Sequence, residues 1–422
     1  MENRNDKKQN INSGGLEISA FQNGAVKEMA PVEYEAEDTA EIFVNEIYLN
    51  ISKRLRVTRF ILLFAIIIIT LFSIMRFSSH INLYSIKEFF YSFKESEIFL
   101  DSSSVAISGA DLISADSYKN YLLMLRNDRV ELYKADGTRY MTKRFSMSKP
   151  TVKTSGKYFL IYDLGGYEIG LYNTVDVIYE QTFDNTIYIA DINDKGYLAL
   201  LTHDVSFASQ LLVYNEDMEK VFEWTSADKY TPCMEMLPDG NRIAVASYSS
   251  NMGAPTTTFN LFNVKSDTAV TREFADTLPL KIGQIGEGIY LLCSDKLVIF
   301  DKNGEILKEI DIISYGNSVS DVYCDGETLA LVLEEEGYSY GSRLVLFDEN
   351  GNSLYTCEEK YEISSSAVIN GDLYYIHYGE LVSVDLEDKT EKRTSLTDSY
   401  SDILEVSGKL VLASDTETLI FS

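Results

Sequence analysis

From residue 97 to its end, the chain repeats one pattern of strands and turns. An apolar strand ends in a turn of Asp, Asn or Gly, as in VELYKADG, LVIFDKNG and LVLFDENG. The residue ahead of this turn recurs at intervals of about 37 to 48 residues, which is the period of a four-stranded propeller blade. It is found at Tyr133, Tyr172, Tyr214, Phe262, Phe300, Phe347, Val384 and Phe421.

A second hairpin keeps the same spacing. It begins with a Gly-containing turn and continues into a β-branched or aromatic strand, as in SGKYFLIYD, DGNRIAVAS and DGETLALVL. The Gly supplies the positive φ that a tight hairpin needs. Two hairpins per period predict four strands per repeat. The chain then holds seven full repeats, from about Val105 to about Thr397, and an eighth of three strands that begins at Ser399.

The incomplete last repeat predicts how a ring would close. An unpaired blade edge would invite aggregation, so the last blade needs a fourth strand. The apolar segment Glu97–Ser103 has no repeat of its own, and we expect it to supply that outer strand. The predicted fold is all-β, a β-propeller of four-stranded blades (eight, alternatively seven), preceded by one transmembrane α-helix. An open solenoid is the alternative, but solenoids end in polar capping repeats and this chain ends in LIFS.

The segment Phe60–Met75 predicts the membrane helix. Widened to Val57–Phe77, it holds about 21 residues and spans about 31 Å, close to the thickness of the hydrocarbon core. Arg59 and Arg76 lie at its ends, where their side chains can reach the headgroups. A buried helix of a soluble protein is the first alternative, although such a helix is rarely apolar on every side. A cleaved signal peptide is the second, although its apolar region is short and close to the N-terminus.

Basic residues predict the orientation of this helix. Four lie before it, whereas the nearest ones after it are Arg76 and Lys87. The positive-inside rule then places the N-terminus in the cytoplasm and the C-terminal bulk outside. The four residues are Lys53, Arg54, Arg56 and Arg59.

Four segments follow from these patterns. Residues 1–52 are expected to form a cytoplasmic tail, disordered and then an amphipathic helix that either lies at the lipid interface or binds a cytoplasmic partner. Residues 53–77 are expected to form the transmembrane helix, residues 78–96 a juxtamembrane stalk, and residues 97–422 the extracytoplasmic β-propeller.

The acidity of the chain belongs to its outer part. The net charge is −28; residues 1–59 carry 8 basic and 10 acidic residues, and the remainder carries 29 and 55. Phosphate backbones are bound by basic surfaces. The charge therefore excludes nucleic acid as a partner and is typical of a soluble outer domain.

No arrangement of residues predicts a metal site or a catalytic centre. The four cysteines form no CxxC pair, and we interpret them as small buried hydrophobic residues, with disulfides permitted in an oxidising compartment. The three histidines are far apart, and the acidic groups Asp191/Asp194 and Glu334–Glu336 are expected to be solvated surface charges. No cofactor is predicted. The cysteines are Cys233, Cys293, Cys324 and Cys357, and the histidines are His80, His203 and His377.

The repeats at Tyr290–Ile310 and Leu329–Tyr355 are similar to blades of the quinoprotein-like propeller superfamily. A basic tail, one membrane helix and an outer ring of such blades resembles an uncharacterised bacterial family of single-pass, membrane-anchored β-propellers with PQQ-like repeats, which carries a domain-of-unknown-function label. The resemblance implies the fold and the anchor. Quinoprotein dehydrogenases dock their blades with repeated tryptophans and hold a quinone with calcium, whereas this chain has one tryptophan, Trp224.

The connections between strands predict a binding face. If the strands of each blade are named A to D from the axis outward, the B–C and D–A connections lie on one face. The third, fourth and sixth blades have long B–C connections, HDVSFASQ, SYSSNMGAPTTT and EEEGYSYGS, and the D–A connections carry tyrosines. Tolerated insertions and structurally packed tyrosines are the alternative interpretation. The candidate binding residues are Phe207, Tyr230, Tyr248, Met252, Tyr315, Tyr338, Tyr340, Tyr361 and Tyr400.

These observations favour a membrane-anchored, non-catalytic binding or scaffolding module. Its expected partners are the lipid bilayer and an extracytoplasmic protein or polysaccharide. An extracytoplasmic enzyme, hydrolase or redox, is the first alternative, although the chain has neither clustered His ligands nor paired Cys residues to support it. A transmembrane sensor that signals through the N-terminal tail is the second.

The orientation can be tested by protease protection. Protease added to intact, wall-stripped cells should release the C-terminal domain and spare a tag at Met1, because the tag would lie in the cytoplasm. Immunoblotting for tags at both ends measures this, with detergent-lysed cells as the control. Loss of the Met1 tag alongside a protected C-terminus would reverse the predicted orientation.

Overall fold

The computed structural model describes residues 59, 61–64, 68, 104–204, 206–251, 253–266, 268–316, 318–334 and 341–421. The chain divides into two compact units, Met1–Ile81 and Asn82–Ser422. In the first unit, residues 59, 61–64 and 68 are helical. None of the helical residues that can be described forms a helix long and apolar enough to cross a membrane. The predicted tail, the stalk and most of the predicted membrane helix lie outside the described residues.

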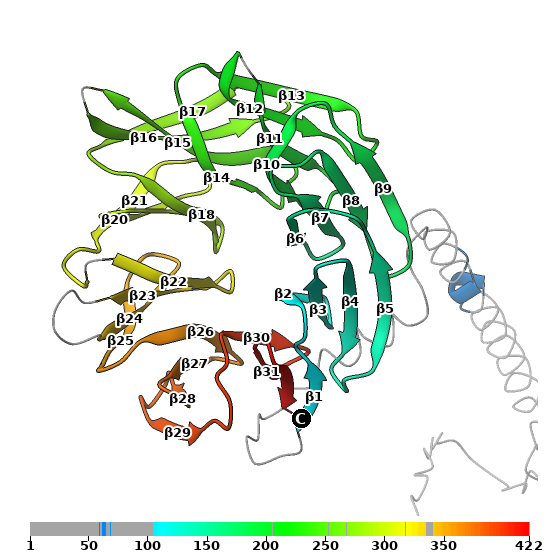
Figure 1. Ribbon diagram of the computed structural model, residues 1–422. Helices are drawn as coiled ribbons and strands as arrows, with labels where there is room; N and C mark the ends of the chain where they lie inside the picture. The colour runs from blue at the N-terminus through cyan, green and yellow to red at the C-terminus, as the bar shows by residue number, and fades with distance from the viewer. Residues whose placement is uncertain are drawn as a thin grey trace, which may run out of the picture. The chain divides into compact units, whose positions relative to one another are not determined.

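The second unit is a ring of eight four-stranded antiparallel sheets (Figure 1). The first blade comprises β2 (Leu112–Tyr118), β3 (Tyr121–Arg126), β4 (Arg129–Lys134) and β5 (Arg139–Arg144). The second comprises β6 (Pro150–Thr154), β7 (Phe159–Asp163), β8 (Glu168–Tyr172) and β9 (Val177–Thr182). The third comprises β10 (Thr186–Ile192), β11 (Leu198–Asp204), β12 (Phe207–Tyr214) and β13 (Lys220–Ser226). The fourth comprises β14 (Tyr230–Met236), β15 (Arg242–Asn251), β16 (Ala254–Asn263) and β17 (Thr268–Ala275).

The remaining blades follow the same order from the axis outward. The fifth comprises β18 (Pro279–Ile285), β19 (Gly288–Cys293), β20 (Lys296–Phe300) and β21 (Ile306–Asp311). The sixth comprises β22 (Ser318–Cys324), β23 (Thr328–Glu334), β24 (Ser342–Asp348) and β25 (Ser353–Glu359). The seventh comprises β26 (Ile363–Ile369), β27 (Asp372–His377), β28 (Glu380–Asp385) and β29 (Glu391–Ser395). The eighth comprises β30 (Asp402–Val406), β31 (Lys409–Ala413), β32 (Glu417–Phe421) and β1 (Ser104–Ser108).

The eighth blade closes the ring with a strand from before the first blade, and this confirms the predicted kind of closure. Strand β1 pairs antiparallel with β32, with Val105 opposite Ile420, and the two lie side by side in Figure 1. The predicted location was wrong. The closing strand is Ser104–Ser108, whereas Glu97–Ser103 lies outside the described residues. Ile107 decides the register, because its side chain is buried in the core between the eighth and first blades.

Burial explains why each type of strand has its own composition. The B strands are enclosed on both faces, so β3 (YLLMLR) and β7 (FLIYD) are buried at every position. The outermost strands face solvent, and β9 (VIYEQT) is mostly exposed. Continuous apolar runs therefore mark the inside of a blade, and mixed polar strands mark its rim.

The long B–C connections of the third and fourth blades are not loops. Strands β15 and β16 have 10 residues each and pair as far as Asn251 and Ala254, and β11 and β12 pair as far as Asp204 and Phe207. In the fourth blade the inserted residues include Thr256, Thr257 and Thr258, and β-branched threonines favour strands. In the sixth blade, residues 335–340 lie outside the described residues.

Side chains of the innermost strands connect neighbouring blades. The Asp191 carboxylate accepts hydrogen bonds from the backbone N–H groups of Ile192 (2.9 Å) and Met236 (2.6 Å), and the second bond crosses to the next blade. Asp321 accepts in the same way from Ser366 N–H at 3.2 Å. Asp191 is only 6% exposed, so its expected role as a solvated surface charge was wrong. Burial raises the pKa of Asp191, and the charge of Lys153 and the two backbone hydrogen bonds partly offset this effect.

A buried ion pair secures the closing strand. Arg126 lies 2.7 Å from the Glu131 carboxylate, and both side chains are almost fully buried. The Arg126 guanidinium also donates hydrogen bonds to the backbone carbonyls of Ser108 (2.7 Å) and Ala110, at the end of β1. Burial acts to raise the pKa of Glu131, but hydrogen bonds from Arg126 and Tyr133 hold it below its ordinary value. Arg126 of the first blade thus holds the strand that completes the eighth blade through hydrogen bonds to its backbone.

Replacing Arg126 by Met should lower the free energy of unfolding by about 3 to 5 kcal/mol at neutral pH, because Glu131 would stay buried without its main partner. Since the folded-state pKa of Glu131 is lowered, its stabilisation is present above about 4.5 and is lost as the pH falls through the lowered value. The difference between wild type and R126M should therefore shrink in acid. Differential scanning calorimetry across pH measures both effects.

Arg139→Met is the matched control. Arg139 lies 3.1 Å from Glu131 but is largely exposed, and exposed ion pairs contribute about 1 kcal/mol or less. Equal destabilisation by R126M and R139M would show that the buried bonds to β1 are not what holds the closure.

Candidate binding face

The exposed large apolar side chains of the propeller gather on one face. We call the face with the B–C turns and D–A connections the upper face and the opposite one the lower face. The upper-face residues are Ile113, Leu164, Tyr167, Tyr188, Tyr230, Leu278, Leu280, Ile313, Tyr361 and Tyr378. In the described part of the propeller, the others lie in or beside the first residues of outermost strands: Val175, Val177, Ile178, Val221, Ile306, Leu307 and Leu354.

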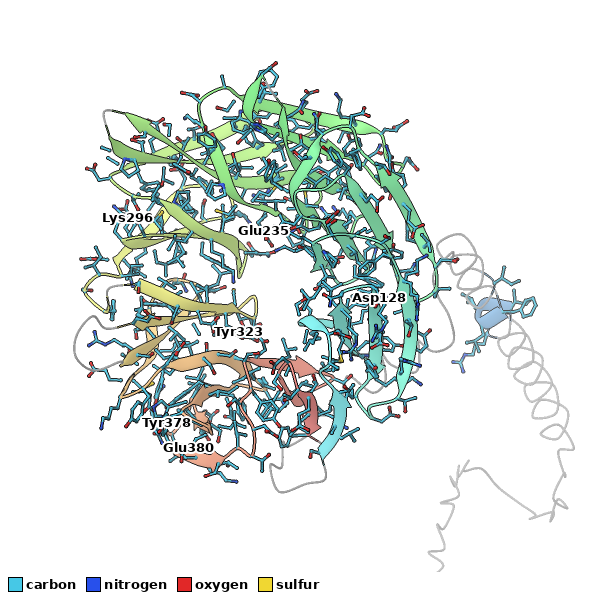
Figure 2. All side chains as sticks on the ribbon, viewed as in Figure 1. Asp128, Glu235, Lys296, Tyr323, Tyr378 and Glu380 are labelled. Carbon is cyan, nitrogen blue, oxygen red and sulfur yellow. The ribbon has the colours of Figure 1, made fainter. Side chains whose placement is uncertain are left out.

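The most exposed aromatic group is a tyrosine pair at the seventh blade. Tyr378 is 72% exposed and stacks on Tyr361, with ring centroids 4.3 Å apart. Tyr378 and Gly379 form the B–C turn of this blade, and Tyr378 has a left-handed φ of 47°. Figure 2 shows Tyr378 beside Glu380. Lys360 Nζ lies 5.4 Å from the Tyr361 ring centroid, so the pair has a cationic neighbour.

An ion-pair network holds the base of this tyrosine pair. Glu359 accepts hydrogen bonds from Arg393 at 2.6 Å and from the Tyr375 hydroxyl at 2.8 Å, and its carboxylate lies 3.4 Å from His377 Nε2. Burial acts to raise the pKa of Glu359, but the Arg393 and Tyr375 hydrogen bonds hold it below the ordinary value. The carboxylate therefore stays ionised, and Arg393, which also lies 3.5 Å from His377 Nδ1, connects it to the residue that precedes Tyr378.

A second aromatic group lies on the third and fourth blades. Tyr230 is 56% exposed and lies opposite Tyr248 on the neighbouring strand, with ring centroids 5.9 Å apart. Tyr188 is 45% exposed and meets the His203 ring edge-on at 6.1 Å.

β-bulges expose three of the upper-face residues. The innermost strands shift register at Ile113, Tyr188 and Leu280. A bulge leaves its extra residue unpaired and turns the side chain away from the regular alternation. Each of these side chains is about half exposed, although the strands that carry them line the interior of the ring.

The structure divides the nine predicted binding residues. Tyr230, Tyr248 and Tyr361 belong to the aromatic pairs of the upper face, and Phe207 is half-buried at the start of β12. Three others lie outside the described residues: Met252, Tyr338 and Tyr340.

Two predicted tyrosines pack inward. Tyr315 is half-buried and meets Phe347 edge-on at 6.2 Å. Tyr400 is 4% exposed and donates a 2.5 Å hydrogen bond to Glu417. Tyr400 therefore offers no surface to a partner. It is a structurally packed tyrosine, which was the alternative interpretation of the tyrosines in the D–A connections.

Sequence reasoning missed three of the exposed tyrosines. Tyr167 and Tyr378 lie in short B–C turns, and among the B–C connections the prediction considered only the long ones. The glycines next to them, Gly166 and Gly379, were a usable signal, because a Tyr–Gly or Gly–Tyr turn between apolar strands places the ring at a hairpin tip. Tyr188 had no such signal, since only strand pairing reveals its bulge.

Two properties of the described residues bear on metal binding and on nucleophilic chemistry: the placement of their possible metal ligands and the reactivity of their thiols. Within those ranges no three His, Cys, Asp or Glu side chains are placed to hold a metal ion. The four cysteines are free thiols. Cys293 is buried as interpreted, whereas Cys233, Cys324 and Cys357 are partly buried and pack against the blade cores. Burial raises the pKa of Cys233 and of Cys293 to about 12, so both stay protonated.

Residues 95–420 match the family of unknown function DUF5711. The chain belongs to the DUF5711 family. The match starts after the predicted membrane helix, so it covers the propeller. No curated protein matches this DUF5711 sequence.

Solved structures share the fold of this DUF5711 propeller. The C-terminal WD40 domain of Sif2 is similar over 75% of this chain and 97% of that domain, at 13% identity and a TM-score of 0.55. BamB from Moraxella catarrhalis is similar over 76% of this chain and 96% of its own, at 11% identity and a TM-score of 0.50. These identities show a common propeller architecture.

Proposed function

We propose that this DUF5711 protein is a non-catalytic binding or scaffolding module whose upper face binds a protein partner. One observation carries the proposal: the exposed aromatic and aliphatic side chains of the ring gather on that face, whereas the others sit at the outer rim of the lower side. Exposed apolar groups that cluster on one face mark an interaction site. Tyrosines with aliphatic neighbours are typical of protein interfaces.

The rigidity of the scaffold supports this proposal. Tyr361 is stacked on Tyr378 and Tyr230 lies against Tyr248, so each pair is preorganised within its blade. Side chains that are already ordered lose less conformational entropy on binding. WD40 domains and BamB share the fold, which is compatible with a binding role but does not by itself assign one.

We further propose that the chain is anchored in a membrane, with the N-terminus in the cytoplasm and the propeller outside. The apolar segment and its basic flank support this. The path of the chain is compatible with it, because β1 begins at Ser104 on the lower face and runs toward the upper face. A tether that joins the ring at the lower face leaves the upper face free for a partner.

Cross-linking in intact cells tests the binding face. The double variant Tyr230→Ser, Tyr378→Ser should lose its cross-linked partner, because buried aromatic anchors at interfaces each contribute about 2 kcal/mol or more. Quantitative mass spectrometry of the cross-linked complexes measures the loss.

The matched control is Val177→Ser, Leu307→Ser, which removes two exposed apolar side chains from outermost strands. It should retain every partner of the wild type. If the folded Tyr230/Tyr378 variant recovers the same partners as wild type, or if both variants lose them equally, the upper face is not the binding face.

A further inference from the structure

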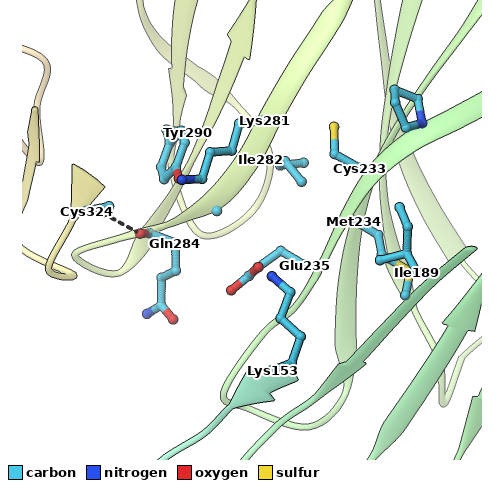
Figure 3. Close-up of a pocket in the computed structure, with 12 residues that line it drawn as sticks. Lys153, Ile189, Cys233, Met234, Glu235, Lys281, Ile282, Gln284, Tyr290 and Cys324 are labelled. Atoms are coloured by element: carbon cyan, nitrogen blue, oxygen red, sulfur yellow. Dashed lines mark hydrogen bonds between the residues drawn. The ribbon is translucent and has the colours of Figure 1, made fainter. Parts of the chain in front are cut away.

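A pocket lies against the ring axis, away from the aromatic pairs of the upper face. It has a volume of about 380 Å³ and is lined by the innermost strands of the second to sixth blades (Figure 3). This volume is within the range of small-molecule sites in proteins, about 300 to 1,000 Å³. Its polar lining residues are Lys153, Glu235, Lys281, Gln284 and Tyr290.

Tyr290 shows that this pocket is more than a gap between blades. The residue is only 2% exposed, yet its hydroxyl forms no hydrogen bond with any described residue. Its ring lies directly over Gly283, where a side chain would come within 3 Å of the phenol. The hydroxyl oxygen is open to the pocket rather than sealed inside the protein, so it is a donor that a molecule in the pocket can use. Burial also raises the pKa of Tyr290, so the hydroxyl keeps its proton.

Two further groups in the pocket lack hydrogen-bond partners among the described residues, Lys153 and Glu235. In Figure 3 their side chains extend toward each other, but they form no ion pair within 4 Å. Burial opposes the charge on Lys153, yet the surrounding carboxylates of Asp191, Glu235 and Asp116 hold its pKa above the ordinary value. Lys153 is therefore charged and available.

The remaining polar groups add hydrogen-bond donors. Lys281 donates one hydrogen bond to the Val322 carbonyl at 2.8 Å, which leaves two N–H groups. Burial, and after it the nearby Asp191 carboxylate, raises the pKa of Glu235 to about 8, while Lys153 and Lys281 act in the opposite direction. Glu235 therefore gains its full negative charge at a higher pH than an ordinary carboxyl group does.

We propose that this pocket binds a small molecule through an oxyanion group, a carboxylate or a phosphate, held by Lys153, Lys281 and the Tyr290 hydroxyl. The donors exceed the acceptors, and an oxyanion supplies the acceptors that these groups lack. The pocket thus brings two lysine side chains and a hydroxyl group together in a chain of net charge −28. This inference concerns the ring axis and does not depend on the proposed protein partner.

Isothermal titration calorimetry on the full-length chain in detergent tests the site with citrate, inorganic phosphate and putrescine as probes. Citrate or phosphate should bind, and putrescine, a dication, should not. Lys153→Met should weaken the binding about tenfold or more, and Tyr290→Phe, which removes a single oxygen, about threefold to tenfold. Lys265→Met changes the same charge at an exposed position and should leave the affinity unchanged.

The pH dependence provides a second readout. Citrate is fully ionised above neutral pH, and its affinity should fall as the pH rises through about 8, where Glu235 gains a negative charge. The neighbouring carboxylates of Asp191 and Asp321 are hydrogen-bonded to backbone N–H groups. Burial lowers the pKa of Lys281, so loss of the Lys281 charge at high pH would also weaken citrate binding. Glu235→Gln distinguishes the titration of Glu235 from that of Lys281. This variant should bind citrate at pH 7 as wild type does, and its affinity should fall much less as the pH rises through about 8.

The proposal is overturned if neither anion binds at about 10 mM, which corresponds to a free energy weaker than about −3 kcal/mol. It is also overturned if putrescine binds more tightly than citrate, or if K153M and wild type bind with equal affinity. Because R126M and the upper-face variants leave the pocket unchanged, these results are independent of the tests above.

Discussion

The pairing of β1 with β32 is the constraint on which the rest of the ring depends. Each blade packs its core against the next, so no blade is complete until the eighth meets the first. The closing strand lies more than 300 residues from its partner in sequence, about the largest separation within the propeller. Arg126 joins the end of that strand to the first blade. Lys409 adds a bond from the eighth blade to the Ala135 carbonyl of the first.

The sequence predicts the blades well because each blade is a local object. A Gly or Asx turn, an apolar run and a second turn define a hairpin within about ten to twenty residues. The sequence predicted that a strand before the first blade completes the last one, but it placed this strand in the wrong segment. EIFLDSS and SVAIS are both short apolar segments, and only the burial of Ile107 against the last blade decides between them. Non-local pairing is the information that local pattern lacks. The same limit explains why inserted residues in β15 and β16 were interpreted as a loop when they extend a hairpin.

The binding face was predictable only as a face. Topology dictates that the B–C and D–A connections lie together, so the side of the ring could be named before any coordinates. Which tyrosines are available could not be named. Tyr361 and Tyr400 occupy equivalent connections, yet one is stacked on an exposed neighbour and the other is buried on Glu417. Their exposure differs because Tyr361 packs on Tyr378 of the seventh blade, whereas Tyr400 packs on the eighth blade. Bulges at Tyr188 and Leu280 turn residues of the innermost strands outward, and no periodicity in the sequence marks a bulge.

The ring axis combines two uses of the same residue types. The carboxylates of Asp191 and Asp321 accept hydrogen bonds from backbone N–H groups of the next blade, so they have a structural role. Lys153, Glu235 and Tyr290 occupy neighbouring positions and form no such bonds with any described residue. Lys153 and Glu235 are half-buried, and the polar ends of all three side chains are open to the pocket. The carboxylates of Asp191 and Asp321 therefore serve the contacts between blades, whereas the donors of Lys153 and Tyr290 serve no such contact. A bound oxyanion would accept hydrogen bonds from these donors.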